Sequence, residues 1–178
     1  MTQPAVIVID LQLGMMSGEA LPPFHDHAGV LKRTAAILDW ARAGGRPVIF
    51  IQHDGEPGDI LDPAKAGWAI HPAIAPLPGE PVLNKTVGDA FAETDLAERL
   101  KALGTDQVIL LGAQTDQCVE ATFNGAKARG LDITVIGDTH STWPYQGESA
   151  EQIIGRYNGL FRAGGARVVD AAELVGVG

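Results

Sequence analysis

Six short apolar runs alternate along the chain with segments of helical periodicity, and this alternation restricts the possible folds more than any other feature. The apolar runs occupy residues 5–9, 47–51, 81–84, 107–111, 133–136 and 167–169. Such runs are typical of strands that are buried on both faces of a parallel sheet. The helical segments lie at about residues 26–44, 94–104, 118–129 and 147–163. Strands that alternate with helices predict an α/β fold in which helices cover both faces of a parallel sheet.

The length of 178 residues suits one well-buried domain and is short for two, so residues 1–178 are expected to form a single domain. Residues 55–81 are rich in Gly and Pro and are too long for an ordinary connection, which is typical of a loop that covers a functional site. Residues 137–147 are predicted to form a second loop, which is polar and aromatic.

The charge of the chain excludes some classes of partner. A formal net charge of −9 and a pI of about 4.9 argue against binding to nucleic acid or to an anionic membrane, and favour a small-molecule substrate. The single cysteine cannot form an intrachain disulfide, and no apolar run reaches the roughly 18 residues that span a bilayer. The first strand begins without the pattern of a secretory leader. These features favour a cytoplasmic enzyme.

Three reactive side chains follow three of the predicted strands. Asp10 follows the first run, Lys85 follows the third, and Cys118 begins the helix after the fourth. The carboxyl ends of parallel strands form one edge of the sheet, where ligands bind near the point at which the strand order reverses. Each residue alone also fits an ordinary role, as a turn cap, a solvated charge or a small core side chain. Together they predict a site that combines an acid, an amine and a thiol.

The stretch Gly112-Ala-Gln-Thr-Asp-Gln-Cys118-Val119 joins the fourth strand to its helix and holds the only cysteine. A thiol at a helix N-terminus lies beside unpaired backbone N–H groups and the positive end of the helix dipole, which stabilise a thiolate. We therefore expect a lowered pKa for Cys118, and reaction with iodoacetamide well below the pH of about 8.5 at which a free thiol ionises.

This stretch, together with the motif Val-Ile-Asp10-Leu-Gln and the segment around Lys85, resembles the isochorismatase-like cysteine hydrolases. That superfamily includes nicotinamidases, N-carbamoylsarcosine amidohydrolase and isochorismatases. The resemblance covers nearly the whole chain and implies a Rossmann-like, three-layer α/β/α sandwich with a six-stranded parallel sheet. It also implies a catalytic triad of Asp10, Lys85 and Cys118, and a cis peptide bond between Ala113 and Gln114. The backbone N–H groups of Gln114 and Cys118 would form the oxyanion hole.

The reaction implied by this resemblance is the hydrolysis of a small-molecule amide or related C–N bond through a thioester. Asp10 would accept the thiol proton and later protonate the leaving nitrogen. Two alternatives stay open: vinyl-ether hydrolysis, as in isochorismatase, and a non-catalytic binding or oligomeric module of the same fold. A dinucleotide-binding domain is disfavoured, because no Gly-x-Gly-x-x-Gly follows the first strand.

Neither a metal nor another cofactor is expected. The place where nicotinamidases hold a metal reads Gln-His53-Asp54-Gly, without an Asp-x-His pattern, and the next histidine is His71. A site built from His53, Asp54 and His71 is the alternative, but its spacing matches no ligand pattern. His53 is instead expected to be a hydrogen-bonded residue at the rim of the pocket.

Aromatic side chains in the predicted loops are candidates for the walls of a small-molecule pocket, with two polar residues as further contacts. The candidate substrate-binding residues are Gln12, Phe24, Trp68, Phe91, Asp116, Trp143 and Tyr145. The aromatic residues among them fit a subunit interface equally well, and we expect a homodimer or a higher homo-oligomer.

Overall fold

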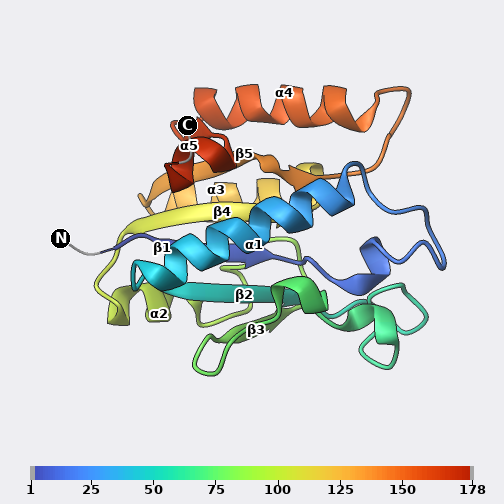
Figure 1. Cartoon of the computed structure of the whole chain (residues 1–178), viewed down its shortest axis with the longest axis horizontal. Helices are drawn as coiled ribbons and strands as arrows, with labels where there is room; N and C mark the ends of the chain where they lie inside the picture. Colours follow the sequence, from blue (N-terminus) through green and yellow to red (C-terminus); the bar gives the residue numbers. More distant parts are fainter. Residues whose placement is uncertain (1–2, 177–178) are drawn as a thin grey trace.

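Six parallel strands form one sheet in the computed structural model, which describes residues 3–176 (Figure 1). The strands are β1 (Ala5–Ile9), β2 (Val48–His53), β3 (Val82–Lys85), β4 (Gln107–Ala113), β5 (Asp132–Ser141) and β6 (Arg167–Val169). Their order is β3-β2-β1-β4-β5-β6, and each neighbouring pair is parallel. The predicted parallel sheet is confirmed. The domain limits predicted at residues 1 and 178 lie outside the described residues.

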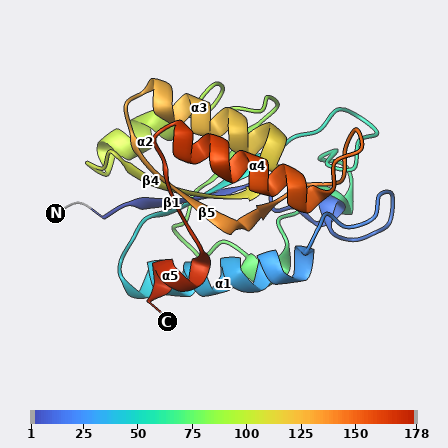
Figure 2. The same cartoon turned by 90° about the horizontal axis from the view of Figure 1, so that it is seen from above.

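Helices cover both faces of the sheet. They are α1 (His27–Ala43), α2 (Leu96–Ala102), α3 (Glu120–Ala128), α4 (Ala150–Ala163) and α5 (Ala171–Val175). Helices α1 and α5 lie on one face, and α2, α3 and α4 lie on the other (Figure 2). This arrangement is the expected three-layer sandwich. Within residues 3–176, no helix has the length and apolar character needed to cross a membrane.

The core is divided in two by the sheet, because successive side chains of a strand point to opposite faces. In β1, Val6 and Val8 pack on the α1 side, whereas Ala5, Ile7 and Ile9 pack on the α2 and α3 side. All five residues of β1 are buried. A central strand buried on both faces explains why the apolar run was continuous rather than alternating.

The strand order reverses between β1 and β4, so the crevice at their carboxyl ends is the expected ligand site. These two strands approach closely where they end, with Ile9 opposite Gly112. A Cβ atom on Gly112 would lie 2.0 Å from the carbonyl oxygen of Ile9, and Gly112 has a φ of 132°. Glycine is therefore required at the start of the cysteine motif.

Three elements differ from the sequence prediction. Strand β5 continues to Ser141, through the first half of the predicted loop 137–147, and its polar end was not recognised as strand. A π-helical turn at Thr115–Val119 precedes α3, so the helix does not begin at Cys118. Helix α5 was missed, because five residues are too short for a periodic pattern.

Candidate active site

Asp10, Lys85 and Cys118 meet at the carboxyl edge of the sheet. Asp10 follows β1, Lys85 is the last residue of β3, and Cys118 lies in the π-helical turn after β4. The Nζ atom of Lys85 lies 2.7 Å from Asp10 Oδ2 and 3.2 Å from Cys118 Sγ. It also donates a hydrogen bond to the carbonyl oxygen of Val87 at 3.0 Å. The structure thus gathers the three predicted side chains around one ammonium group.

Asp10 and Lys85 form a buried ion pair, with side chains that are 1% and 0% exposed. Burial raises the pKa of Asp10 above its ordinary value, although Lys85 acts in the opposite direction. Burial also opposes the charge of Lys85, but Asp10 and Cys118 raise the pKa of Lys85 overall. Among the described residues, the buried Oδ1 atom of Asp10 has no hydrogen-bond partner. Asp10 therefore offers a free oxygen and is a stronger base than an ordinary carboxylate.

The expected thiolate at Cys118 is wrong. Burial and the charge of Asp10 raise the pKa of Cys118 to about 12, although Lys85 lowers it. Desolvation of the charged form and the negative charge of Asp10 outweigh the effect of the ammonium group. The thiol is protonated at neutral pH, so a role as nucleophile would require a base that removes its proton.

We expect the alkylation of Cys118 by iodoacetamide to accelerate up to at least about pH 10, because a raised pKa delays ionisation to higher pH. Mass spectrometry of the intact protein measures the rate, and the single cysteine makes the labelled site unambiguous. The same protein in denaturant provides the rate for a free thiol. A rate that levels off below about pH 8 would restore the original expectation of a thiolate.

Asp10 and Cys118 line a cavity of about 470 Å³ at this edge. Its apolar walls are formed by Met15, Leu21, Ile60, Leu61 and Trp143. Residues 60 and 61 belong to the long loop between β2 and β3, so this loop borders the site as predicted. The volume suits a small molecule.

The backbone beside Cys118 has the form that the resemblance implied. The peptide bond between Ala113 and Gln114 is cis. Gln114 lines the same cavity as Cys118, together with Gln117. The assignment of the Gln114 and Cys118 N–H groups to an oxyanion hole stays a prediction.

Two candidate substrate-binding residues serve the fold instead. Gln12 is fully buried, and its side chain accepts a hydrogen bond from His53 N at 2.8 Å and donates to the carbonyl oxygens of His53 and Trp68. Phe91 is 4% exposed and lies in the core on the α2 and α3 side, where the guanidinium of Arg129 stacks on it. Neither residue lines the cavity beside Cys118, because packing inside the protein already occupies these side chains, and their contact with substrate stays a prediction.

Trp143 lines the cavity, and its contact with substrate stays a prediction. Phe24 is buried behind it, with the two rings edge to face at 6.1 Å, so Phe24 supports the wall instead of forming it. The remaining three candidates, Trp68, Asp116 and Tyr145, are not among the residues that line the cavity. The position of a residue in a predicted loop did not distinguish the candidates that line the cavity from those that do not.

His53 is the predicted rim residue. It lines the cavity, and its Nδ1 atom lies 3.3 Å from Lys85 Nζ. Burial and the charge of Lys85 lower the pKa of His53, so its ring is neutral at neutral pH. The sequence prediction assigned no role in the site to its neighbours in the cavity, Asp59 and Gln117.

The residues at this edge do not fit a divalent metal ion. Ligand atoms of Asp10, His53 and Cys118 lie within 4.8 Å of one another, which is close enough for a shared ion. However, Lys85 Nζ lies within 3.3 Å of all three residues, and its positive charge occupies the centre of the group. The alternative metal site of His53, Asp54 and His71 is not assembled either, because His71 caps a separate turn through Nδ1.

A buried hydrogen-bond chain supports the π-helical turn, and no sequence pattern indicated it. Thr115 Oγ1 lies 2.8 Å from His140 Nδ1, and His140 Nε2 lies 2.9 Å from Asn158 Oδ1. Asn158 donates its amide to the carbonyl oxygen of Gly137, so its oxygen accepts from His140. His140 therefore carries its proton on Nε2 and accepts from Thr115.

Burial lowers the pKa of His140 to about 4, and this makes stability depend on pH. Between this value and the ordinary value near 6.5 the unfolded chain binds a proton that the folded chain does not, so stability falls as the pH drops. We expect a loss of about 2 kcal/mol from His140 between neutral pH and about pH 4.5. Urea denaturation at neutral pH and at about pH 4.5 measures it, with His140→Gln as the reference. Equal pH dependence in the two proteins would contradict the assignment.

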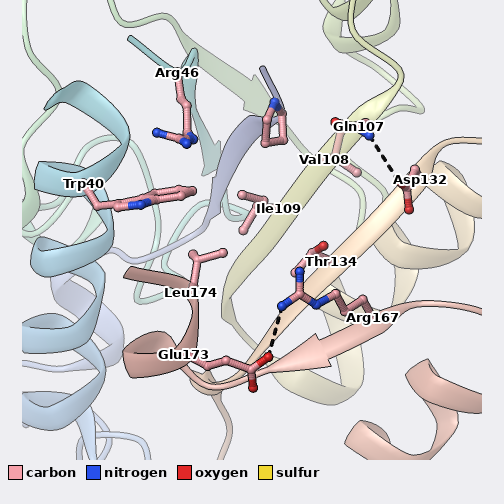
Figure 3. Close-up of a pocket in the computed structure, with 11 residues that line it drawn as sticks. Trp40, Arg46, Gln107, Val108, Ile109, Asp132, Thr134, Arg167, Glu173 and Leu174 are labelled. Carbon is pink, nitrogen blue, oxygen red and sulfur yellow. Dashed lines mark hydrogen bonds and ion pairs between the residues drawn. The ribbon is translucent and has the colours of Figure 1, made fainter. Parts of the chain in front are cut away.

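A second cavity, of about 340 Å³, lies at the opposite edge, where the strands begin (Figure 3). In it the guanidinium of Arg46 stacks over Trp40 at 3.8 Å, and Arg167 pairs with Glu173 at 3.0 Å. Its lining contains no cysteine, histidine or lysine. The cavity beside Cys118 is therefore the better candidate for catalysis.

Comparisons with known proteins show the family of this chain. The isochorismatase domain model matches residues 4–173. Streptothricin hydrolase from Streptomyces noursei is 38% identical over 140 residues, which cover 78% of this chain and 54% of that protein. Maleamate amidohydrolase from Pseudomonas putida is 29% identical over 158 residues, which cover 78% of this chain and 74% of that protein. The chain spans about half the length of the streptothricin hydrolases that it matches.

Solved structures show the same similarity. An isochorismatase from Pseudomonas putida has a TM-score of 0.89 and 29% identity, covering 96% of this chain and 89% of that one. N-carbamoylsarcosine amidase from Thermoplasma acidophilum has a TM-score of 0.78 and 25% identity, covering 95% of this chain and 96% of that one. Since the family model spans nearly all of the sequence, the chain belongs to the isochorismatase family.

Proposed function

We propose that this protein is a cysteine hydrolase of a small-molecule amide or related C–N bond, with Asp10, Lys85 and Cys118 as its catalytic triad. The observation that carries the proposal is the contact of Lys85 Nζ with both Asp10 and Cys118 beside a cavity. The names of the maleamate amidohydrolase and of the N-carbamoylsarcosine amidase support a hydrolase of C–N bonds.

In the first step the Cys118 thiol proton passes to Asp10 while the sulfur attacks the carbonyl carbon. The raised pKa of Asp10 and its free Oδ1 atom suit it to this role. Because the thiol has a pKa of about 12, proton transfer accompanies the attack instead of preceding it. Lys85 stabilises the negative charge that develops on sulfur.

The carbonyl oxygen then carries a negative charge, which the N–H groups of Gln114 and Cys118 would stabilise. The C–N bond breaks as Asp10 returns the proton to the leaving nitrogen, and a thioester remains. Asp10 next accepts a proton from water as that water attacks the thioester. The carboxylic acid departs, and Cys118 recovers its proton.

A substrate screen tests this proposal. Small amides, carbamoyl compounds and lactams are incubated with the protein and with Cys118→Ser, and released ammonia or amine is measured. A vinyl-ether substrate is included for the alternative chemistry of the family. Release of amine by the wild type alone supports the proposal, whereas equal release by both proteins overturns it.

A further inference from the structure

We propose that Asp59 makes this cavity selective for amides that carry a positive charge away from the bond to be cleaved. This inference rests on the proposed function and names its substrate class. Asp59 lies in the loop between β2 and β3 and lines the same cavity as Asp10 and Cys118. It was not among the residues that the sequence indicated.

Asp59 supplies the unbalanced charge of the cavity. Asp10, the other acidic residue in the lining, is neutralised by Lys85 at 2.7 Å. His53 is neutral at neutral pH, because burial and Lys85 lower its pKa. Within residues 3–176, Asp59 belongs to no ion pair. A bound ligand therefore meets a net negative wall.

The loop holds the Asp59 carboxylate in place and leaves part of it free. Its Oδ1 atom accepts a hydrogen bond from Leu61 N at 2.8 Å, and its own N–H donates to the carbonyl oxygen of Glu56 at 2.9 Å. A Cβ atom on Gly55 would lie 2.9 Å from Asp59 Oδ1, so the glycine makes room for this conformation. In the described chain, Oδ2 accepts no side-chain or backbone hydrogen bond and can receive one from a ligand.

The other walls suit a cation on an apolar stem. Trp143 lines the cavity, and its ring is fixed by donation from Nε1 to the carbonyl oxygen of Pro22 at 2.6 Å and by the edge-to-face contact with Phe24. An aromatic face attracts an ammonium or guanidinium group. Ile60 and Leu61 offer apolar surface for an aliphatic chain. The net charge of −9 also draws cations toward the protein.

A pair of variants isolates the charge. Asp59→Asn keeps an oxygen that can accept from Leu61 N and removes only the negative charge. Glu56→Gln is the matched control, because Glu56 is an exposed acidic residue of the same loop that does not line the cavity. Both variants change the net charge of the protein equally, so the long-range attraction of the protein for cations changes by the same amount in each.

The first measurement compares three amides of similar length, ε-aminocaproamide, heptanamide and adipamic acid, which end in an ammonium, a methyl and a carboxylate group. We expect the wild type and Glu56→Gln to favour the ammonium compound over heptanamide in kcat/KM by about fivefold, and Asp59→Asn to lose this preference. The acid is expected to be the poorest of the three.

The second measurement does not depend on hydrolysis. Aminoethyl and sulfonatoethyl methanethiosulfonate, which are a cation and an anion, label Cys118, the only cysteine. The ratio of their labelling rates cancels any change in thiol reactivity. We expect this ratio to fall about fivefold in Asp59→Asn and to hold in Glu56→Gln.

The two assays separate the proposals. A lower labelling ratio in Asp59→Asn supports the selectivity, whether or not the amides are cleaved. If none of the three amides is cleaved, that failure counts only against the proposed hydrolysis of such amides. Cleavage of all three amides with the same preference in all proteins supports the hydrolase and overturns the role of Asp59. An unchanged labelling ratio overturns that role as well.

Discussion

Replacement of Cys118 by alanine is expected to lower kcat/KM for a hydrolysed amide by about 10³-fold or more, because no thioester can form. Cys118→Ser is expected to lose nearly as much. A hydroxyl keeps the geometry, but its proton is harder to remove at a site that already raises the pKa of the thiol to about 12. Steady-state kinetics on the amide identified by the screen measures both losses.

A folding control accompanies these variants. Cys118 is partly buried at the edge of the apolar cluster on the α2 and α3 side, so its replacement is expected to change the free energy of unfolding by only about 1 kcal/mol. Urea denaturation checks this value. Activity near the wild-type level in a folded Cys118→Ala protein would refute the nucleophile.

Replacement of Lys85 by methionine is expected to lower the free energy of unfolding by about 3–5 kcal/mol at neutral pH, because it leaves the buried charge of Asp10 unpaired. The double variant Asp10→Asn with Lys85→Met is expected to recover most of this loss, since it buries no charge. Both proteins are expected to lose activity by about 10³-fold, because each lacks a member of the proposed triad. The double variant is therefore expected to recover stability but not activity.

The pH dependence of Lys85→Met provides a further check on the ion pair. Without the ammonium group, burial raises the pKa of Asp10 further, so the folded variant holds a proton that the unfolded chain releases. Its stability falls as the pH rises above the ordinary pKa of an aspartate, and the deficit is smallest in acid. Urea denaturation across this range measures the deficit.

An exposed ion pair is the matched control. Arg156 and Glu148 lie 2.7 Å apart with side chains that are about half exposed, and Arg156→Met is expected to change stability little. If Lys85→Met proved as stable as Arg156→Met at neutral pH, the buried pair would not contribute to the fold in the way argued above.

The sequence determined the architecture and the meeting of Asp10, Lys85 and Cys118. Both follow from local patterns, because continuous apolar runs define buried strands and parallel strands share a carboxyl edge. Asp10 follows β1, Lys85 ends β3 and Cys118 lies in the turn after β4, so their convergence needed only the sheet. The polar end of β5 was not predicted, because Thr139 and His140 are buried although they are polar, and hydrogen bonds satisfy the His140 ring.

Only the tertiary structure decided the state of the thiol and the walls of the cavity. The pKa of Cys118 depends on how deeply neighbouring elements bury it, and burial turned an expected thiolate into a protonated thiol. Gln12 and Phe91 were candidates by their positions in the sequence, yet packing uses both inside the protein. Asp59 lines the cavity because the long loop between β2 and β3 passes beside it. Burial and loop path depend on residues distant in sequence, whereas the patterns that predict strands and helices are local.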